Sequence, residues 1–375
     1  MTQPVYLDYN ATAPLRPEAL DAMTAALSTV GNASSLHGFG RQARRTVEDA
    51  REQVAALVGA RPAQVVFTAG GTEANNQALR ACGRTRVLIS AGEHDSVLQA
   101  VPQALRIPLR RDGLVSLAKL ASLLAEEPAP ALVSLQLANN ETGVMQPVAE
   151  AAALAREFGA LVHCDAVQAA GKIPVDFALL GIDLMTLSAH KLGGPQGIGA
   201  LVVADDVELR PLLRGGGQER GRRAGTENVA AIAGFGAAAL AARQGLGRLQ
   251  VWRDAFEAEL MALGPAVTIF GAAAQRLPNT TCVALPGLAA ESQLMALDLA
   301  GVAVSSGSAC SSGKVAPSHV LAAMGATEAE AQAALRISTG WASGQDDYAR
   351  FLEAWRPLAQ KAMQALRPAE GAVTA

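Results

Sequence analysis

The chain is poor in charge and in long apolar runs, and each shortage excludes a class of protein. Charged residues make up 17% of its 375 residues and the formal net charge is −3, so no basic field attracts nucleic acid or an anionic membrane. No apolar run reaches the roughly 18 residues of a transmembrane helix, and residues 1–8 lack the features of a signal peptide. Because 50% of the residues are hydrophobic, disorder is excluded. We expect a cytoplasmic globular protein without nucleic-acid or membrane partners.

Cysteine is also scarce. The four cysteines are Cys82, Cys164, Cys282 and Cys310. Their number and spacing predict neither a disulfide framework nor a zinc site or redox dithiol. Cys164 and Cys282 fall in apolar stretches, where a thiol is an inert core residue. Cys310 lies in the Ser/Gly-rich segment 305–313, whose small residues cannot pack a core, so we expect an accessible thiol there, which Lys314 would help to ionise.

Short apolar runs alternate with helical periodicity over the first 205 residues. The runs lie at 65–67, 87–89, 131–137, 160–164, 184–187 and 200–203. They predict buried strands, and the stretch 41–58 predicts a helix with Gly59 as its C-cap. This α/β alternation favours a mostly parallel sheet with helices on both faces, in which ligands bind beyond the carboxyl ends of the strands. After about residue 245 the pattern changes to one typical of a smaller α+β domain, with helices at 249–263 and 346–366 and strands at 282–285 and 336–338.

Two side chains stand at predicted strand ends. Lys191 is one of five lysines, and the other four have unremarkable settings. It follows the strand 184–187, where a buried amine has a lowered pKa and can form a Schiff base; the alternative is an ordinary loop lysine. Asp165 ends the run 160–164, with Gln168 three residues on. Its carboxylate either meets a cationic group in the cleft or caps the next helix.

Two further segments follow strands. Residues 68–75 combine a strand end, a glycine turn and a helix start, and the free N–H groups of a helix start suit a phosphate. The alternative is a tight turn with a threonine cap. The segment matches neither a Walker A sequence nor GxGxxG, so a nucleotide-binding protein or NAD-dependent dehydrogenase is not favoured. His94, after the strand 87–89, either stacks on a planar ring and moves a proton or is a polar loop residue.

A lysine, an aspartate and a phosphate cradle at three strand ends are the parts that hold pyridoxal phosphate. With these segments in order, the chain resembles the NifS/IscS-like cysteine desulfurases of the class-V pyridoxal-phosphate-dependent aminotransferase family. The other matching segments are 6–12 (YLDYNAT), 31–37 (GNASSLH), 139–143 (NNETG), 219–226 (ERGRRAGT) and 336–338 (RIS). The resemblance covers nearly the whole chain. It implies a fold-type I enzyme and a homodimer, with a large domain at 13–245 built on a mostly parallel seven-stranded sheet. Residues 1–12 and 246–375 would form the small α+β domain.

The resemblance also implies a role for each matching residue. Lys191 would hold the cofactor and move the Cα proton, Asp165 would pair with the ring nitrogen, and Cys310 would accept the sulfur. His94 would stack on the ring and act as acid or base. Four residues would bind the phosphate: Gly71, Thr72, Ser188 and His190. Thr226 would reach the phosphate of the partner subunit, and Gln168 would bond the phenolic oxygen. Asn140 would bind the substrate and the cofactor, and Arg336 would bind the substrate carboxylate.

The activity implied is conversion of L-cysteine to L-alanine. The sulfur would leave as a persulfide on Cys310 for a sulfur acceptor or an iron–sulfur scaffold protein. No intrinsic metal is expected, although Cys310 is a candidate transient ligand of an iron–sulfur cluster. Gln218 departs from the histidine that relatives often carry there. Two alternatives remain open: another class-V enzyme, such as a selenocysteine lyase or an aminotransferase, which would not need Cys310, and a non-catalytic binding protein on this fold.

Overall fold

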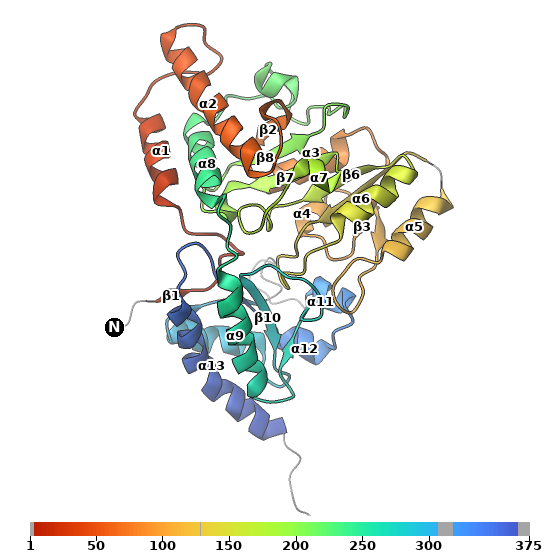
Figure 1. The fold of residues 1–375 in the computed structure, drawn as a ribbon, viewed down its shortest axis with the longest axis vertical. Coiled ribbons are helices and arrows are strands. Elements are labelled where there is room, and N and C mark those ends of the chain that lie inside the picture. The colour runs from red at the N-terminus through yellow and green to blue at the C-terminus, as the bar shows by residue number, and fades with distance from the viewer. Residues whose placement is uncertain (1–3, 128, 307–317, 367–375) are drawn as a thin grey trace, which may run out of the picture.

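The computed structural model describes residues 4–127, 129–306 and 318–366. Its largest feature is a seven-stranded sheet (Figure 1). In spatial order the strands are β2 (Val65–Thr68), β8 (Gly199–Val203), β7 (Leu184–Ser188), β6 (Leu161–Asp165), β5 (Ala131–Gln136), β3 (Arg86–Ser90) and β4 (Leu105–Ile107). All run parallel except β8, which is antiparallel to both neighbours. The predicted α/β class and mostly parallel seven-stranded sheet are confirmed.

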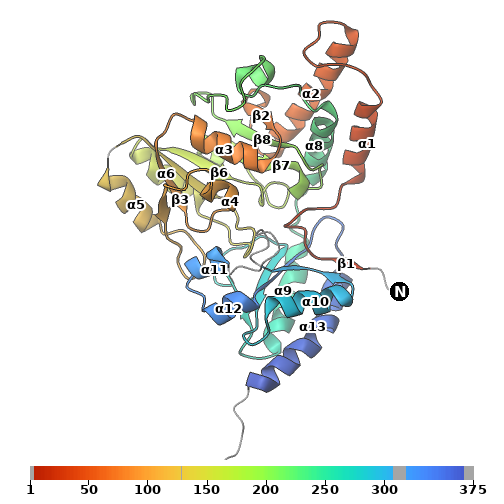
Figure 2. The ribbon, with the colours of Figure 1, turned by 180° about the vertical axis from the view of Figure 1, so that it is seen from behind.

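Helices cover both faces of this sheet. They are α1 (Pro17–Leu27), α2 (Gly38–Leu57), α3 (Gly71–Ala81), α4 (Asp95–Leu98), α5 (Leu117–Glu126), α6 (Val148–Glu157), α7 (Phe177–Leu180) and α8 (Val229–Ala242). Alternate strand residues point to opposite faces: Val65 and Phe67 join a core with α2, α6 and α8, whereas Val66 joins a core with α3. Figure 2 shows α3 and α4 on the face opposite to α2 and α8.

The C-terminal part forms a second, smaller unit of sheet and helices. Its antiparallel sheet has the order β12 (Ser305–Ser306), β13 (Leu335–Ser338), β10 (Thr280–Ala284) and β9 (Thr268–Ile269). Its helices are α9 (Leu249–Ala262), α10 (Ala290–Leu299), α11 (His319–Ala323), α12 (Glu328–Ala333) and α13 (Gln345–Leu366). The N-terminal strand β1 (Val5–Tyr6) pairs with β11 (Val302–Ala303), so both ends of the described chain pack here. The residue limits of the two domains stay a prediction.

Most predicted elements are present with small shifts. The six predicted strands of the large sheet are all found, and the helix predicted at 41–58 begins earlier, at Gly38, because His37 caps it through Nδ1. Gly59 takes the positive φ of 64° that a C-terminal helix cap requires. The sequence pattern missed β4, because two of its three residues are exposed and it has no apolar run.

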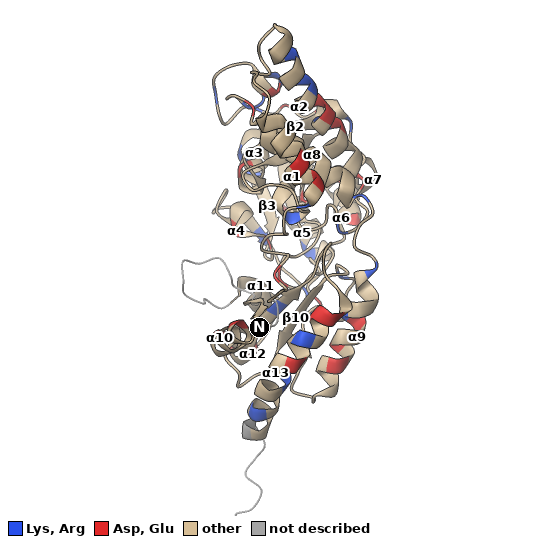
Figure 3. Ribbon diagram, turned by 90° about the vertical axis from the view of Figure 1, so that its left-hand side faces the viewer, with Lys and Arg blue, Asp and Glu red and all other residues tan. Residues whose placement is uncertain are grey.

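The surface carries both signs of charge. Basic and acidic residues are interspersed along the outer helices α2 and α9 (Figure 3). Among the residues that the structure describes, no helix has both the length and the apolarity that crossing a bilayer requires.

Candidate active site

The predicted site residues gather at one edge of the large sheet. β6 ends at Asp165, β7 ends at Ser188 and continues into the 3-10 turn Ala189–Lys191, and β2 leads into α3. Because β2, β6 and β7 run in the same direction, their carboxyl ends meet. The strand ends therefore bring together side chains that are far apart in the sequence.

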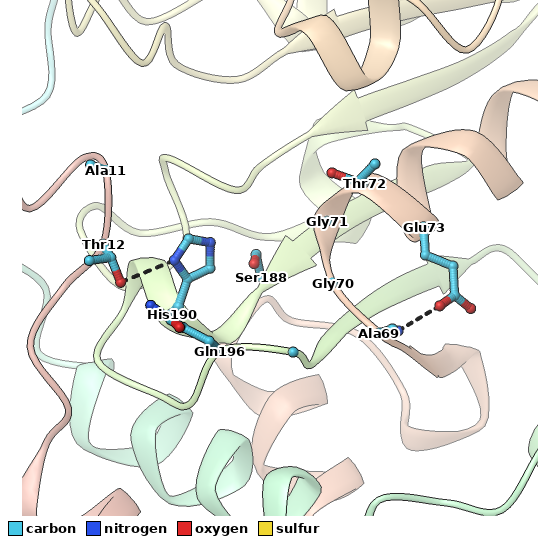
Figure 4. A pocket seen from close by; sticks show the side chains of 11 residues that line it. Ala11, Thr12, Ala69, Gly70, Gly71, Thr72, Glu73, Ser188, His190 and Gln196 are labelled. Atoms are coloured by element: carbon cyan, nitrogen blue, oxygen red, sulfur yellow. Dashed lines mark hydrogen bonds between the residues drawn. The ribbon is translucent and has the colours of Figure 1, made fainter. Parts of the chain in front are cut away.

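A cavity of about 690 Å³ lies at this edge (Figure 4). Four of its lining residues are the predicted phosphate-binding positions Gly71, Thr72, Ser188 and His190. The N-terminus of α3 opens onto it, and the first N–H groups of a helix have no partner within the helix. Helix α3 begins at Gly71 after Gly70, without a side-chain cap, so no threonine caps it, as the alternative required.

Gly71 is tightly placed at this helix start. A Cβ there would lie 3.1 Å from Val167 Cγ2 and 3.5 Å from the Ser188 Cβ. A side chain would therefore narrow the floor of the cavity, and glycine leaves the helix N–H groups accessible to an anion.

His190 is neutral at physiological pH. Burial, assisted by the charge of Lys191, lowers its pKa to about 4. Its Nδ1 lies 3.2 Å from Thr12 Oγ1 (Figure 4). A neutral ring held by the Thr12 hydroxyl can donate one hydrogen bond to an anion without carrying a charge of its own.

Asp165 is held by two donors. Asn75 Nδ2 donates to its Oδ2 at 2.8 Å and the Val167 N–H donates to its Oδ1 at 3.0 Å. No helix begins after Asp165, so the helix-cap alternative is wrong. Asn75 was not among the predicted site residues. Its place one turn after Gly71 on α3 is the signal that could have identified it, because positions three or four apart share one helix face.

His94 is half-buried and lies near Asp165 and Lys191. Its Nδ1 accepts from the Ser96 N–H at 3.1 Å, which assigns the proton of the neutral ring to Nε2. Burial lowers its pKa, and the charges of Asp165 and Lys191 both act on the ring. His94 therefore lies within electrostatic range of Asp165 and Lys191, and its role at the site stays a prediction.

Lys191 directly follows His190, which lines the cavity. Its Nζ donates to the carbonyl oxygens of Asn10 and Ala11, at 2.6 and 2.8 Å. Ala11 and the next residue, Thr12, line the cavity. The segment around Asn10 thus holds the amine, a role that the sequence did not predict for Asn10.

Arg336 and Asn140 meet between the two parts of the fold. The Arg336 guanidinium, on β13, donates to the Asn140 carbonyl at 3.2 Å and pairs with Asp8 at 2.7 Å. Its Nε is buried without a partner. A guanidinium with an unused donor is suited to a further carboxylate.

Two predicted site residues, Thr226 and Cys310, lie elsewhere or cannot be placed, and the same holds for Gln218 and Lys314. Thr226 is exposed and is not among the residues lining the cavity of its own chain. Cys310 lies outside the described residues, as does Lys314. Gln218 accepts from the Gly225 N–H at 3.2 Å and so stabilises its own loop.

The cysteines that the structure describes are buried thiols. Cys164 and Cys282 lie in β6 and β10, as predicted, and Cys82 ends α3. Burial raises the pKa of all three thiols. A raised pKa suppresses the thiolate, so none of the three is suited to nucleophilic attack.

Ser318 and His319 contact residues that are sequence neighbours of the predicted site residues Asn140 and His94. Ser318 Oγ donates to Glu141, whose pKa burial raises to about 7, and Ser318 also caps α11. His319 Nε2 lies 2.9 Å from the Glu93 carbonyl oxygen. Neither contact was predicted, because they join segments separated by more than 170 residues.

Pyridoxal phosphate fits these residues. The cradle at Gly71 offers helix N–H groups to a phosphate, and Asp165 offers a carboxylate held by donors on other atoms. Lys191, next to the cavity-lining His190, supplies a primary amine. No cluster of three or more histidine, cysteine or acidic side chains occurs among the described residues.

Comparisons with known proteins agree with this geometry. Residues 5–351 match the family described as aminotransferase class V, which defines the class of protein. The chain is 41% identical to an IscS-like cysteine desulfurase of Mycobacterium tuberculosis, over 98% of this chain and 99% of that one. The structure of a NifS-like protein from Rickettsia africae matches with a TM-score of 0.88 and 35% identity, over 95% and 99% of the two chains.

A third match is a solved structure described as SspA in complex with cysteine. It is 30% identical, with a TM-score of 0.77, over 89% of this chain and 98% of that one. The chain therefore belongs to the class-V aminotransferase family and, within it, to the NifS/IscS-like cysteine desulfurases.

A histidine behind the site predicts how stability depends on pH. His163 is fully buried between Ser134 and Thr186, and burial lowers its pKa from 6.5 to about 4. The unfolded chain takes up a proton between these values and the folded chain does not, so this residue lowers stability as pH falls from about 6.5 to about 4. When the pH is lowered from 7 to 4.5, the free energy of unfolding should fall in both proteins, but by about 2 kcal/mol less in His163→Gln than in wild type.

Urea unfolding at the two pH values measures this difference. Exposed Gln250, which does not titrate, supplies the control, because Gln250→Asn should lose as much free energy of unfolding as wild type between the two pH values. Equal losses in wild type and His163→Gln would contradict the buried, neutral state of His163.

Proposed function

We propose that this chain uses pyridoxal phosphate to convert L-cysteine to L-alanine and passes the sulfur through Cys310. The observation that carries the proposal is the convergence of Lys191, Asp165 and the Gly71 cradle at one sheet edge. A relative whose structure is described as a complex with cysteine supports the choice of substrate.

Each residue near the cofactor has a defined task. Bound pyridoxal phosphate supplies an electron sink, which makes the substrate Cα proton removable. Lys191 binds the cofactor through its amine and takes that proton. Asp165, oriented by Asn75, keeps the ring nitrogen protonated. His94 packs on the ring, with its Nε2–H as a proton donor.

The phosphate is bound by neutral donors. Gly71 and Thr72 contribute N–H groups of the α3 N-terminus, and Ser188 and His190 contribute side-chain donors from the same cavity. The absence of charge on His190 means that the helix end supplies most of the local attraction for the anion.

Sulfur transfer would use the cysteine that lies outside the described residues. The Cys310 thiolate attacks the sulfur of the substrate, a new S–S bond forms and the Cβ–S bond breaks. The electron pair of that bond stays on Cβ, which takes up a proton to become the methyl group of alanine. Cys310 is left as a persulfide, and no external oxidant or reductant is needed for this step.

The partners follow from this chemistry. The persulfide would pass to a sulfur acceptor or an iron–sulfur scaffold protein in the cytoplasm, where Cys310 would act as a transient cluster ligand. The chain would work as a homodimer in which Thr226 reaches the phosphate of the partner subunit. Exposed apolar side chains near α1 and α2 support such an interface. They are Leu27, Val30, Leu36 and Phe39.

Product analysis tests the activity. Purified protein with pyridoxal phosphate, L-cysteine and a thiol reductant should release alanine and sulfide in equal amounts. Transfer of the amino group to pyruvate without sulfide would instead identify an aminotransferase and overturn the proposal.

Replacing Arg336 should mainly weaken substrate binding. The guanidinium forks onto the substrate carboxylate equally in the ground state and the transition state, so Arg336→Lys should raise KM about 10- to 100-fold with little change in kcat. Steady-state kinetics measure both constants, and Arg356→Lys on the exposed face of α13 serves as the control. An unchanged KM would show that Arg336 does not bind the carboxylate.

A further inference from the structure

Lys172 is a buried lysine next to the proposed active site. It is 3% exposed, and its Nζ donates to Gln168 Oε1 and to Asn10 Oδ1, both at 2.6 Å. The sequence indicated no special role for it, but the structure places it at the centre of a polar network. We propose that Lys172 is a positioning residue that fixes the orientation of the Gln168 amide and of the Asn10 segment that holds Lys191.

The hydrogen bonds allow Gln168 only one orientation. Its Oε1 accepts from Lys172, and its Nε2 donates to the Asn10 carbonyl at 2.9 Å. A reversed amide would place N–H donors against the donors of Lys172 and a carbonyl oxygen against the Asn10 carbonyl oxygen. Lys172 thus keeps the donor end of Gln168 available. This inference rests on the proposed function, in which that donor bonds the phenolic oxygen of the cofactor.

The same amine holds the segment beneath Lys191. Asn10 Oδ1 accepts from Lys172, while the Asn10 carbonyl accepts from both Lys191 and Gln168. The Asn10 Nδ2 donates to Thr280 Oγ1 at 2.9 Å, in β10. Lys172 therefore fixes Asn10, the residue that accepts from Lys191 and that also contacts β10 in the smaller unit of the fold.

The electrostatic setting argues against a simple stabilising role. Burial lowers the pKa of Lys172 well below 10.5, and the nearby charges of Lys191 and Arg336 lower it further. Within the described ranges, no carboxylate forms an ion pair with it. A buried amine among cations costs free energy that an apolar side chain of similar length would not. Two N–H donors suffice for its two bonds, so it can orient Gln168 in either protonation state.

The experiment compares Lys172→Met with wild type, each loaded with pyridoxal phosphate. We expect the pH midpoint of the cofactor absorbance change to rise by about one unit, because a phenolate oxygen that loses its donor is less stable. We also expect kcat to fall about tenfold, because a tenfold change in rate and a one-unit shift in the midpoint correspond to the same free energy. The KM for L-cysteine should be nearly unchanged. Lys172→Arg keeps N–H donors at this position, so its midpoint should lie between those of Lys172→Met and wild type.

A double variant shows whether the effect passes through Gln168. If it does, Gln168→Leu should shift the midpoint as Lys172→Met does, and combining the two should add little. Full additivity of the two shifts would overturn the inference. Thermal unfolding checks that each variant folds. If Lys172→Met does not fold, Lys172→Leu replaces it, because its side chain also has no donor and the same shift is expected.

Failure of the proposed function and failure of the role of Lys172 would give different results. A wild-type protein that neither binds pyridoxal phosphate nor releases sulfide would overturn the proposed function. A coloured, active wild type whose midpoint is unchanged by Lys172→Met would overturn only the role of Lys172.

Discussion

Replacing Lys191 with alanine should abolish the turnover of L-cysteine, with a loss of more than about 10⁴-fold in kcat. The amine is the only proposed group that both binds the cofactor and moves the Cα proton. Both tasks require a primary amine at the position where Nζ meets the carbonyl oxygens of Asn10 and Ala11. Alanine and sulfide release at saturating cofactor measure the loss.

The matched control is Lys119→Ala. Lys119 is exposed on α5, far from the strand ends that form the site. It should keep wild-type activity, since surface substitutions rarely change stability by more than about 0.5 kcal/mol. Substantial turnover by Lys191→Ala would remove Lys191 from the proposed chemistry.

Replacing Cys310 with serine should separate the two halves of the reaction. The variant should bind pyridoxal phosphate and still show the absorbance change on addition of L-cysteine, because Lys191 and Asp165 are intact. Sulfide release should fall by about 10³-fold or more, since a hydroxyl cannot accept sulfur as a thiolate does. Absorbance and sulfide assays on one sample measure both effects.

Cys82→Ala supplies the control for this experiment. Cys82 is a buried thiol whose pKa is raised by burial, so its loss should leave sulfide release unchanged. Full sulfide production by Cys310→Ser would show that another group accepts the sulfur.

The positions of Asp165, Ser188 and Gly71 could be predicted because each lies at or just after the end of a strand. Carboxyl ends of parallel strands meet at one edge, so locating the strands also locates the side chains that follow them. The pattern of apolar runs therefore gave the edge of the sheet and the cradle at α3. The alternatives for Asp165 and for the turn before α3 could be decided only by the structure, since aspartate and threonine also cap helices.

The roles of Asn10, Asn75 and Lys172 could not be predicted in this way. Lys172 bonds Asn10 across 162 residues, and Asn75 bonds Asp165 across 90. Such contacts depend on how helices and the two parts of the fold pack together, which local periodicity does not encode. A buried lysine also has no local signature, because its neighbours in sequence do not show that other elements cover it.

Chemical trapping tests the central claim most directly. The protein is incubated with pyridoxal phosphate, reduced with borohydride and digested, and the modified peptide is identified by mass spectrometry. The proposed function predicts that the cofactor is fixed to the peptide containing Lys191, with Lys172 unmodified. Fixation on another lysine, or none at all, would contradict it.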